Sequence, residues 1–290
     1  MEFKVYKDVN EFYDATYDLL MCDEAQNLIP LGNIIIGKKG KDKTGWRDPA
    51  NWFMATVSDD NGIQLVAMMT PPHNIALYTR DNKIDEVAVA CLMAELADMP
   101  LPGVIARKDI ALHFAQTYCT AKGMIYETEM DQRIYELTEV NPDIAHIGTM
   151  RLAEKSDAYF IPYWLEAFYS SGTYGKTTMS IPQDIEIFLA RIEEKRLYIL
   201  EHEGKPVSMA AIMRDMQTVC GVGLVYTPPY FRGKGYATSC VAKLSQIILE
   251  RGFTKCALYT DLANPTSNSI YQKIGYRPIC DSMMLKFNKG

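Results

Sequence analysis

The alternation of apolar and polar positions is clearest between residues 219 and 252. Residues 219–226 are rich in β-branched and aromatic side chains and predict a buried strand, which the pair Pro228-Pro229 ends. Apolar residues then recur at the three- and four-residue spacing of a helix, at Ala237, Val241, Leu244 and Ile248. Gly252 stands where such a helix would have its C-terminal cap. This part of the chain therefore reads as strand, turn and helix.

The second half of the chain predicts further alternating elements. We expect strands at 147–152 and 256–260, helical segments at 157–169 and 182–195, and a hairpin of 197–202 with 207–213 through Glu203-Gly204-Lys205. The helical segment at 157–169 is aromatic, with Tyr159, Phe160, Tyr163, Trp164 and Phe168. We interpret these rings as core, with a substrate-binding wall as the alternative.

The first half shows a similar order of elements. The pattern predicts helices at 9–22, 84–98 and 107–121 and strands at 52–57, 64–70 and 133–137. Met69-Thr70-Pro71-Pro72 parallels Tyr226-Thr227-Pro228-Pro229 in following a strand. Asn141-Pro142-Asp143 interrupts the pattern, so we place a domain boundary between Val140 and His146. The basic loop Gly37–Asp48 is expected to be mobile, with a lid as its functional alternative.

The turn Arg232-Gly233-Lys234-Gly235 carries the chemistry that the pattern favours most. Glycines let successive backbone N–H groups converge on an anion, and the following helix offers its positive end. Such a turn is weak evidence alone, because a tight connection looks the same. The turn lacks the spacing of a nucleotide-triphosphate loop, and it lacks the third glycine and the downstream acid of a dinucleotide fingerprint. A pyrophosphate is the ligand that we expect.

Arg232-x-x-Gly235-x-Ala237 resembles the acetyl-coenzyme A signature [QR]xxGx[GA] of the GNAT N-acetyltransferases. Downstream, Asn264-x-x-Ser267-x-x-x-Tyr271 and Lys273-Ile274-Gly275-Tyr276 resemble the second half of that family, and the likeness covers about residues 146–288. It implies a GNAT fold, of the α/β (α+β) class, with a mixed, mainly antiparallel sheet flanked by helices.

The resemblance also implies roles for individual residues. Backbone groups of Val225, Tyr226 and Thr227 would run beside the pantetheine arm, and Asn264 would reach that arm. The N–H groups of Arg232, Gly233, Lys234, Gly235, Tyr236 and Ala237 would hold the pyrophosphate. Tyr271 would protonate the leaving thiolate, for which a phenol with a pKa near 10 is suited. The alternatives are a helix cap for Asn264, a core ring for Tyr271 and a solvated side chain for Lys234.

The similar order of elements in the two halves suggests two tandem GNAT-like domains. Residues 146–290 would be the catalytic domain that binds acetyl-CoA. Residues 1–140 would be a degenerate copy or an unrelated cap, because HNIALYTRDNK after Pro72 contains no R-x-x-G-x-[GA]. We expect no acetyl-CoA site in the first half.

We thus expect an acetyl-CoA-dependent N-acetyltransferase that acts on a primary amine of a small molecule or peptide. A non-catalytic acetyl-CoA-binding regulatory module is the alternative. An ε-amine with a pKa near 10.4 lies about 3.4 units above pH 7, so exposing its lone pair costs roughly 4.6 kcal/mol and calls for a base. Glu201, His202 and Asp261 are open candidates for a water-mediated relay.

Composition narrows the remaining choices. The 290 residues are 48% hydrophobic and 23% charged, and the net charge of −6 with a pI near 5.4 argues against nucleic-acid binding. The chain has no run of 18 apolar residues and a charged N-terminus, so we expect a cytoplasmic protein without a membrane segment. Seven cysteines and four histidines are scattered without metal-ligand spacing, which predicts no metal. The oligomeric state is open, with a homodimer as one option.

Overall fold

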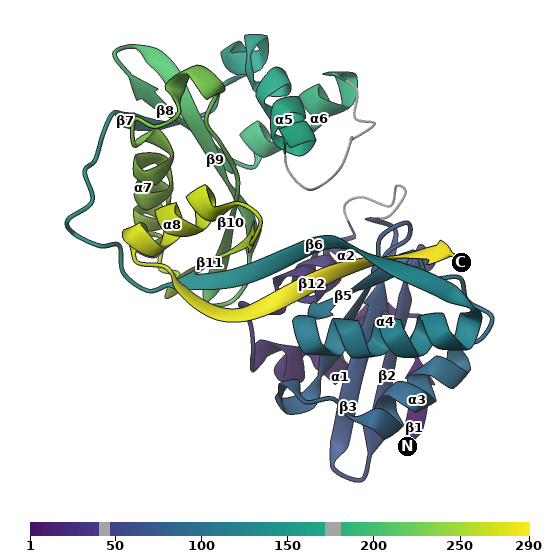
Figure 1. Ribbon diagram of the computed structural model, residues 1–290. Helices are drawn as coiled ribbons and strands as arrows, with labels where there is room; N and C mark the ends of the chain where they lie inside the picture. The colour runs from purple at the N-terminus through teal and green to yellow at the C-terminus, as the bar shows by residue number, and fades with distance from the viewer. Residues whose placement is uncertain (41–46, 172–180) are drawn as a thin grey trace. The chain divides into compact units, whose positions relative to one another are not determined.

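The computed structural model describes residues 1–40, 47–171 and 181–290, and its strands and helices form two compact units (Figure 1). Unit 1 contains Met1–Arg133 and Cys280–Gly290, and unit 2 contains Ile134–Ile279. The limits of the units fall inside two long strands, β6 (Met124–Leu137) and β12 (Arg277–Lys289). Each of these strands therefore contributes residues to both units.

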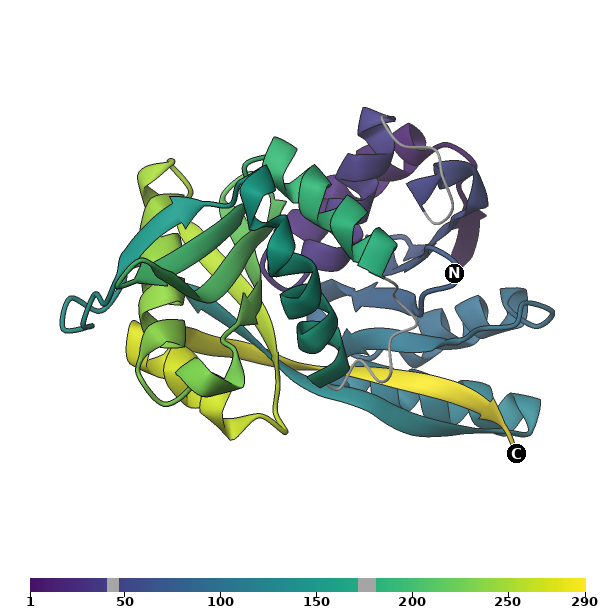
Figure 2. The same cartoon turned by 90° about the horizontal axis from the view of Figure 1, so that it is seen from above.

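Unit 1 is a sheet with helices on both faces. Its elements are β1 (Glu2–Val5), α1 (Val9–Met21), α2 (Leu28–Lys39), η2 (Pro49–Asn51), β2 (Phe53–Asp59), β3 (Gly62–Met69), β4 (Ile75–Thr79), η3 (Arg80–Asn82), α3 (Glu86–Glu95), β5 (Gly103–Arg107) and α4 (Lys108–Lys122). The strand order is β1-β2-β3-β4-β5-β12-β6. Figure 2 shows the purple helices α1 and α2 on one side of these strands and the teal helix α4 on the other.

The core of unit 1 follows from the apolar stripes of its helices. Phe114 of α4 and Leu92 of α3 are fully buried. They belong to a cluster that includes Leu65 of β3 and Leu285 of β12. Their burial against the sheet is what makes short helices stable here, since an isolated helix of this length is marginal in water. The C-terminal residues of the chain are thus part of this core.

Unit 2 has the same kind of construction. Its elements are β7 (Thr149–Leu152), η4 (Lys155–Tyr159), α5 (Ile161–Ser171), α6 (Ile181–Glu193), β8 (Leu197–His202), β9 (Lys205–Asp215), β10 (Val219–Tyr226), η5 (Pro229–Phe231), α7 (Tyr236–Glu250), β11 (Lys255–Asp261) and α8 (Pro265–Ile274). The strand order is β12-β6-β11-β10-β9-β8-β7. Separate apolar clusters lie beneath α7 with α8 and beneath α5 with α6, which cover opposite faces (Figure 1).

Both units follow one order of elements: a strand, two helices, three antiparallel strands, a helix, a strand, a helix and a final strand. In each unit the third antiparallel strand is also parallel to the strand after the next helix, β4 with β5 and β10 with β11. A parallel pair requires a crossover, which α3 and α7 supply.

Most expected elements of unit 2 are confirmed, including the strand at 219–226 and the hairpin β8–β9. In unit 1, β1, α2, β4 and β5 were not expected from the sequence. Met69-Thr70-Pro71-Pro72 follows a strand as expected, but that strand is β3, whereas the strand that corresponds to β10 by its parallel pairing is β4. The segment HNIALYTRDNK contains this strand, Ile75–Thr79.

The compact units do not coincide with the expected domains 1–140 and 146–290. Asn141 lies within unit 2, where its N–H donates to the carbonyl of Ile274 at 2.8 Å and its side-chain amide donates to the carbonyl of Lys273 at 3.1 Å. Val140 is buried in the core of that unit. The unit boundary falls instead within the continuous strand β6, where no break in composition marks it.

The basic segment Gly37–Asp48 is only partly within the described residues. Gly37 to Lys39 form the last turn of α2, and a Cβ on Gly37 would lie 2.7 Å from the ring of Trp52. Residues 41–46 lie outside the described part, so the lid interpretation stays a prediction. In the part of the chain that is described, no helix is both long enough and apolar enough to cross a membrane.

Candidate active site

Strands β10 and β11 separate toward their carboxyl ends. Their parallel pairing joins Val219–Gly221 to Lys255–Ala257, and among the described residues it goes no further although both strands continue. β10 carries one extra residue relative to β9 between Gly223 and Tyr226, and Leu224 has a φ of 50°. Such a β-bulge bends the strand. Beyond Gly221 the backbone of β10 therefore runs without a ladder to β11, and we refer to this feature as the strand gap.

The residues after β10 are held by side chains. The Ser208 hydroxyl donates to the carbonyl of Tyr226 at 3.1 Å, and its oxygen lies 2.8 Å from the Thr227 hydroxyl. Arg232 donates through Nε to the carbonyl of Thr227 at 3.0 Å. Arg232 therefore fastens the end of the turn to the end of the strand. Ser208, fully buried on β9, was not among the expected site residues; a lone hydroxyl within the apolar run 207–213 was the available signal.

The turn Arg232–Ala237 has the conformation that its glycines favour. Gly233 and Gly235 have φ values of 74° and 81°, in the left-handed region that other residues avoid. Gly235 is the N-cap of α7 and provides no side-chain acceptor for the first N–H groups of the helix. These donors and the helix dipole favour an anion at this place. The turn thus has the left-handed glycines and the open helix start that the sequence predicts, and pyrophosphate binding stays a prediction.

Buried contacts hold the first turn of α7 in place. Tyr236 is buried, with its ring 5.3 Å from that of His202 and 6.2 Å from that of Phe231. The Ser239 hydroxyl donates to the carbonyl of Ile147 at 2.8 Å. Tyr236 and Ala237 thus occupy the first turn of a helix whose N-terminus is anchored on buried structure.

Asn264 begins α8, immediately beyond β11. Its side-chain oxygen accepts a hydrogen bond from the N–H of Ser267 at 3.1 Å, and Pro265 occupies the first helical position. The capping alternative is therefore confirmed for this oxygen. Asn264 is also exposed. A role toward the pantetheine arm stays a prediction, and it would fall to the amide nitrogen.

Tyr271 lies on α8 and is 8% exposed. Its ring centroid is 6.4 Å from that of Tyr135 and 5.9 Å from that of Tyr276, so it belongs to the core beneath α7 and α8. The nearby Tyr276 hydroxyl is 2.8 Å from the Ser245 hydroxyl, and burial raises the pKa of Tyr276 well above its usual value. Tyr271 therefore has a packing role whatever its chemistry.

The three candidate bases differ in their surroundings. Glu201 accepts from Arg151 Nε at 2.8 Å and so is held in an ion pair. His202 is the next residue and the last of β8, and its ring lies against that of Tyr236. Asp261 ends β11 beside the strand gap and accepts from the N–H of Ala263 at 2.8 Å. The carboxyl ends of β8, β10 and β11 all lie at one end of the sheet. Asp261 is on the strand next to β10, whereas Glu201 is two strands away on β8, so the position of Asp261 fits the role better.

The aromatic segment 157–169 is largely core, as interpreted from the sequence. Phe160 is buried in the cluster beneath α5, and Trp164 is partly buried with its ring 5.9 Å from that of Tyr226. Tyr159 and Tyr163 are exposed by 69% and 55%. The residues between α5 and α6, 172–180, lie outside the described part.

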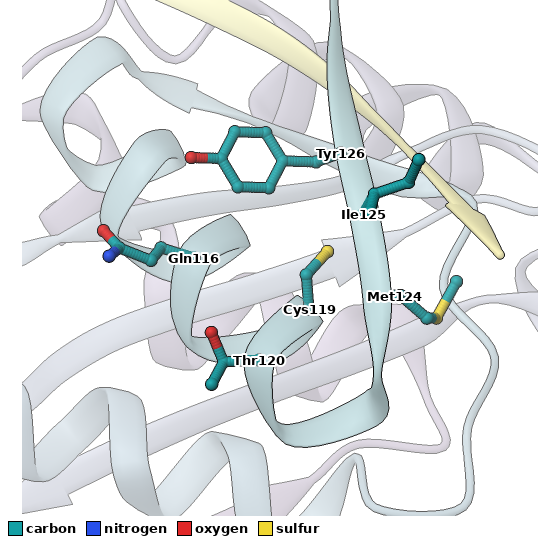
Figure 3. A pocket seen from close by; sticks show the side chains of 6 residues that line it. All are labelled: Gln116, Cys119, Thr120, Met124, Ile125 and Tyr126. Atoms are coloured by element: carbon teal, nitrogen blue, oxygen red, sulfur yellow. The ribbon is translucent and has the colours of Figure 1, made fainter. Parts of the chain in front are cut away.

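Figure 3 shows an open pocket that is distinct from these features. It lies in unit 1 between α4 and the start of β6, and its lining is formed by Gln116, Cys119, Thr120, Met124, Ile125 and Tyr126. Burial raises the pKa of the Cys119 thiol, so that thiol is a poor nucleophile. Within the described residues, no three His, Cys, Asp or Glu side chains are grouped as metal ligands.

Comparison with known proteins agrees with this geometry. Residues 159–276 match the model of the acetyltransferase (GNAT) family. A GCN5-related N-acetyltransferase from Sphaerobacter thermophilus is 13% identical, with 98% of this chain and 95% of that chain covered and a TM-score of 0.67. A GNAT-family acetyltransferase from Colwellia psychrerythraea is 12% identical, with 99% of each chain covered and a TM-score of 0.58.

A Drosophila protein of known structure is 11% identical, with 99% and 98% covered and a TM-score of 0.67. These likenesses over nearly whole chains concern the fold. No curated protein matches the chain in sequence. Residues 159–276 thus match the acetyltransferase (GNAT) family, and the strand–turn–helix geometry described above lies within that match.

Proposed function

We propose that the protein is an acetyl-CoA-dependent N-acetyltransferase that transfers the acetyl group to a primary amine of a metabolite or peptide. The observation that carries the proposal is the meeting of the strand gap with the turn Arg232–Ala237. A pantetheine arm contains amides that can pair with exposed strand backbone, and its pyrophosphate requires convergent N–H donors. Unit 2 offers both features on one edge of its sheet.

Different residues would bind different parts of the cofactor. The main chain of Val225, Tyr226 and Thr227 would pair with the pantetheine arm. The turn, ending at Tyr236 and Ala237, would hold the pyrophosphate. The amide nitrogen of Asn264 would reach the arm from the start of α8, while its oxygen stays in the helix cap.

The chemistry then needs a base and an acid. Acetyl-CoA supplies a thioester whose carbonyl carbon accepts the amine. Asp261, through water, would take the proton of the ammonium, which a base must remove when the amine has a pKa near 10.4. Tyr271 would donate a proton to the departing thiolate. The N-terminal end of α7 and the turn keep the anionic part of the cofactor in place during transfer.

Unit 1 would be a second, degenerate GNAT-like copy. The shared order of elements and the parallel pairs β4–β5 and β10–β11 support this view. Helix α3 is capped differently from α7, because the Asp85 carboxylate accepts from the N–H groups of Val87 and Ala88 at 3.0 and 2.9 Å. That carboxylate occupies donors that a phosphate would need, and its charge repels one.

The experiment is an assay of acetyl-CoA consumption with a panel of amines. We expect slow hydrolysis alone and a marked acceleration by one class of amine, with the acetylated amine identified by mass spectrometry. Binding of acetyl-CoA without acceleration by any amine would favour the non-catalytic regulatory module. The absence of a thermal shift with coenzyme A would contradict both functions.

A further inference from the structure

One aromatic ring beside the turn is exposed to an unusual degree. Tyr230, in the short helix η5, is 80% exposed, the highest value among the exposed large hydrophobic side chains in the described part of the protein. Its neighbour Phe231 is packed against the core and meets the Tyr230 ring edge-on, with centroids 5.3 Å apart and an angle of 82° between the planes. Phe231 thus joins the exposed Tyr230 ring to the core.

A cation lies over the same ring. The ammonium of Lys234 is 4.9 Å from the centroid of Tyr230 and 6.0 Å from that of Phe231. The other cation of the turn, Arg232, is tied to the carbonyl of Thr227. An exposed cation–π contact of this kind is weak, so a doubly charged phosphate can compete for the ammonium.

The backbone around Tyr230 is stiff. Pro228 and Pro229 precede it, and Pro229 is the first residue of η5. The N–H of Arg232, directly after η5, donates to the carbonyl of Pro229 at 3.2 Å. Proline restricts φ and so limits the conformations of the segment. The ring is therefore presented by a preorganised turn, which reduces the entropy lost when a ligand stacks on it.

We propose that Tyr230 and Lys234 bind the 3′-phosphoadenosine end of coenzyme A, the ring by stacking on adenine and the ammonium by contacting the 3′-phosphate. This inference rests on the proposed function. In coenzyme A the pyrophosphate joins the pantetheine arm to the nucleoside, so an arm directed into the strand gap leaves the nucleoside at the solvent-exposed side of the turn. Tyr230 and Lys234 are the flat ring and the cation that this side presents.

The two groups have separable signatures. Stacking on an aromatic ring does not depend on the 3′-phosphate, and truncating such a ring weakens binding by roughly fivefold to a hundredfold. The ammonium acts only on the phosphate. Tyr230 should therefore affect the binding of coenzyme A and of 3′-dephospho-coenzyme A equally, whereas Lys234 should affect coenzyme A alone.

The test is isothermal titration of the full chain with both ligands. For the unaltered protein we expect coenzyme A to bind at least about tenfold more tightly than the dephospho form. Lys234→Ala should reduce this preference below about threefold and leave the dephospho affinity unchanged. Tyr230→Ala should weaken both ligands by the same factor of at least about five, and Tyr230→Phe should retain both.

Matched controls are Lys243→Ala on α7 and Tyr163→Ala on α5, which should change neither Kd. Equal affinity of the unaltered protein for both ligands, or a preference that survives Lys234→Ala, would overturn the role of Lys234. Unchanged binding in Tyr230→Ala would overturn the stacking role. Failure of the unaltered protein to bind either ligand would instead contradict the proposed function, so the two failures are distinguishable.

Discussion

At the scale of single residues, the turn Arg232–Ala237 depends on backbone conformation more than on side-chain chemistry. Gly235 has a φ of 81°, and a Cβ there would lie 3.2 Å from Ile147 Cδ1. A side chain at this position would also stand beside the first N–H groups of α7. The glycine is therefore required both for the shape of the turn and for access of an anion to it.

Gly235→Glu is expected to weaken acetyl-CoA binding at least thirtyfold, or about 2 kcal/mol, because a carboxylate would oppose the pyrophosphate. Titration calorimetry measures the change. Gly252→Glu is the control: it puts the same residue at a φ of 98° at the other end of α7, where a Cβ meets nothing within 4 Å. An unaltered affinity in the folded Gly235→Glu protein would remove the basis for the pyrophosphate assignment.

Tyr271→Phe removes the proposed proton donor and keeps the buried ring, so it separates a catalytic role of Tyr271 from a packing role. The ring stays in the core, so the affinity for acetyl-CoA should hold while kcat falls about 10² to 10⁴-fold through loss of the proton donor. Steady-state kinetics with the best amine provide the measurement.

The control for Tyr271 is Tyr276→Phe, which leaves Ser245 without its partner and should lower the free energy of unfolding by about 1–3 kcal/mol. Its kcat should be unaffected. If kcat of Tyr271→Phe drops less than about threefold, Tyr271 is structural and solvent protonates the thiolate.

At the scale of elements, β7 and η4 are joined by a partly buried ion pair. Arg151 of β7 donates to both carboxylate oxygens of Asp157, at 2.7 and 2.8 Å, and the N–H of Glu154 donates to the same carboxylate at 2.7 Å. Burial raises the pKa of Asp157, but these hydrogen bonds lower it by more, so it lies below the ordinary value of 3.8. A lowered pKa in the folded state means that ionised Asp157 stabilises unit 2.

This contribution is present above about pH 4 and is lost as the pH falls through the folded-state pKa below that value. Asp157→Asn should lower the free energy of unfolding at pH 7 by about 1–3 kcal/mol, since Arg151 keeps Glu201 as a partner. It should also flatten the loss of stability between about pH 4 and pH 2. Urea unfolding across this range measures both effects, with the exposed Asp143→Asn as control. If Asp157→Asn loses as much stability between about pH 4 and pH 2 as the unaltered protein does, Asp157 does not have this role.

At the scale of the whole molecule, the two units differ in how their crossover helices begin. α7 begins at a glycine without a side-chain cap, and α3 begins at the carboxylate of Asp85. We therefore expect a stoichiometry of one coenzyme A per chain in titration calorimetry. Two sites per chain, or a crystal structure with coenzyme A in unit 1, would refute the degenerate-copy view.

The C-terminal strand should be essential to the N-terminal part of the chain. Ser282–Lys286 pairs with Gly103–Arg107, and Met283, Leu285 and Phe287 are buried in the core of unit 1. Removing residues 280–290 should destabilise unit 1 by more than about 5 kcal/mol, at about 1.5–3 kcal/mol for each large apolar side chain. Hydrogen exchange of β5 and α4 would report this loss. Removal of Lys289 and Gly290 alone is the control, and protection that persists without 280–290 would contradict the expectation.

The sequence by itself determined the local elements around the candidate site. The strand at 219–226, the helix after Gly235 and the cap at Asn264 were predictable because each depends on the periodicity or capping chemistry of neighbouring residues. The motif Arg232-x-x-Gly235-x-Ala237, between this strand and this helix, predicted where the turn lies. The short strands β4 and β5 of unit 1 were missed because strands of five residues carry little periodicity.

Only the tertiary structure decided which strands pair and where. The bulge at Leu224, the short β10–β11 ladder and the Ser208 contact depend on register between distant segments, which no local pattern encodes. The division of β6 and β12 between two units follows from the same cause. A strand takes its place from the partners that bury its side chains and satisfy its backbone, and for Ser282–Lys286 the partners on β5 lie more than 170 positions earlier in the chain.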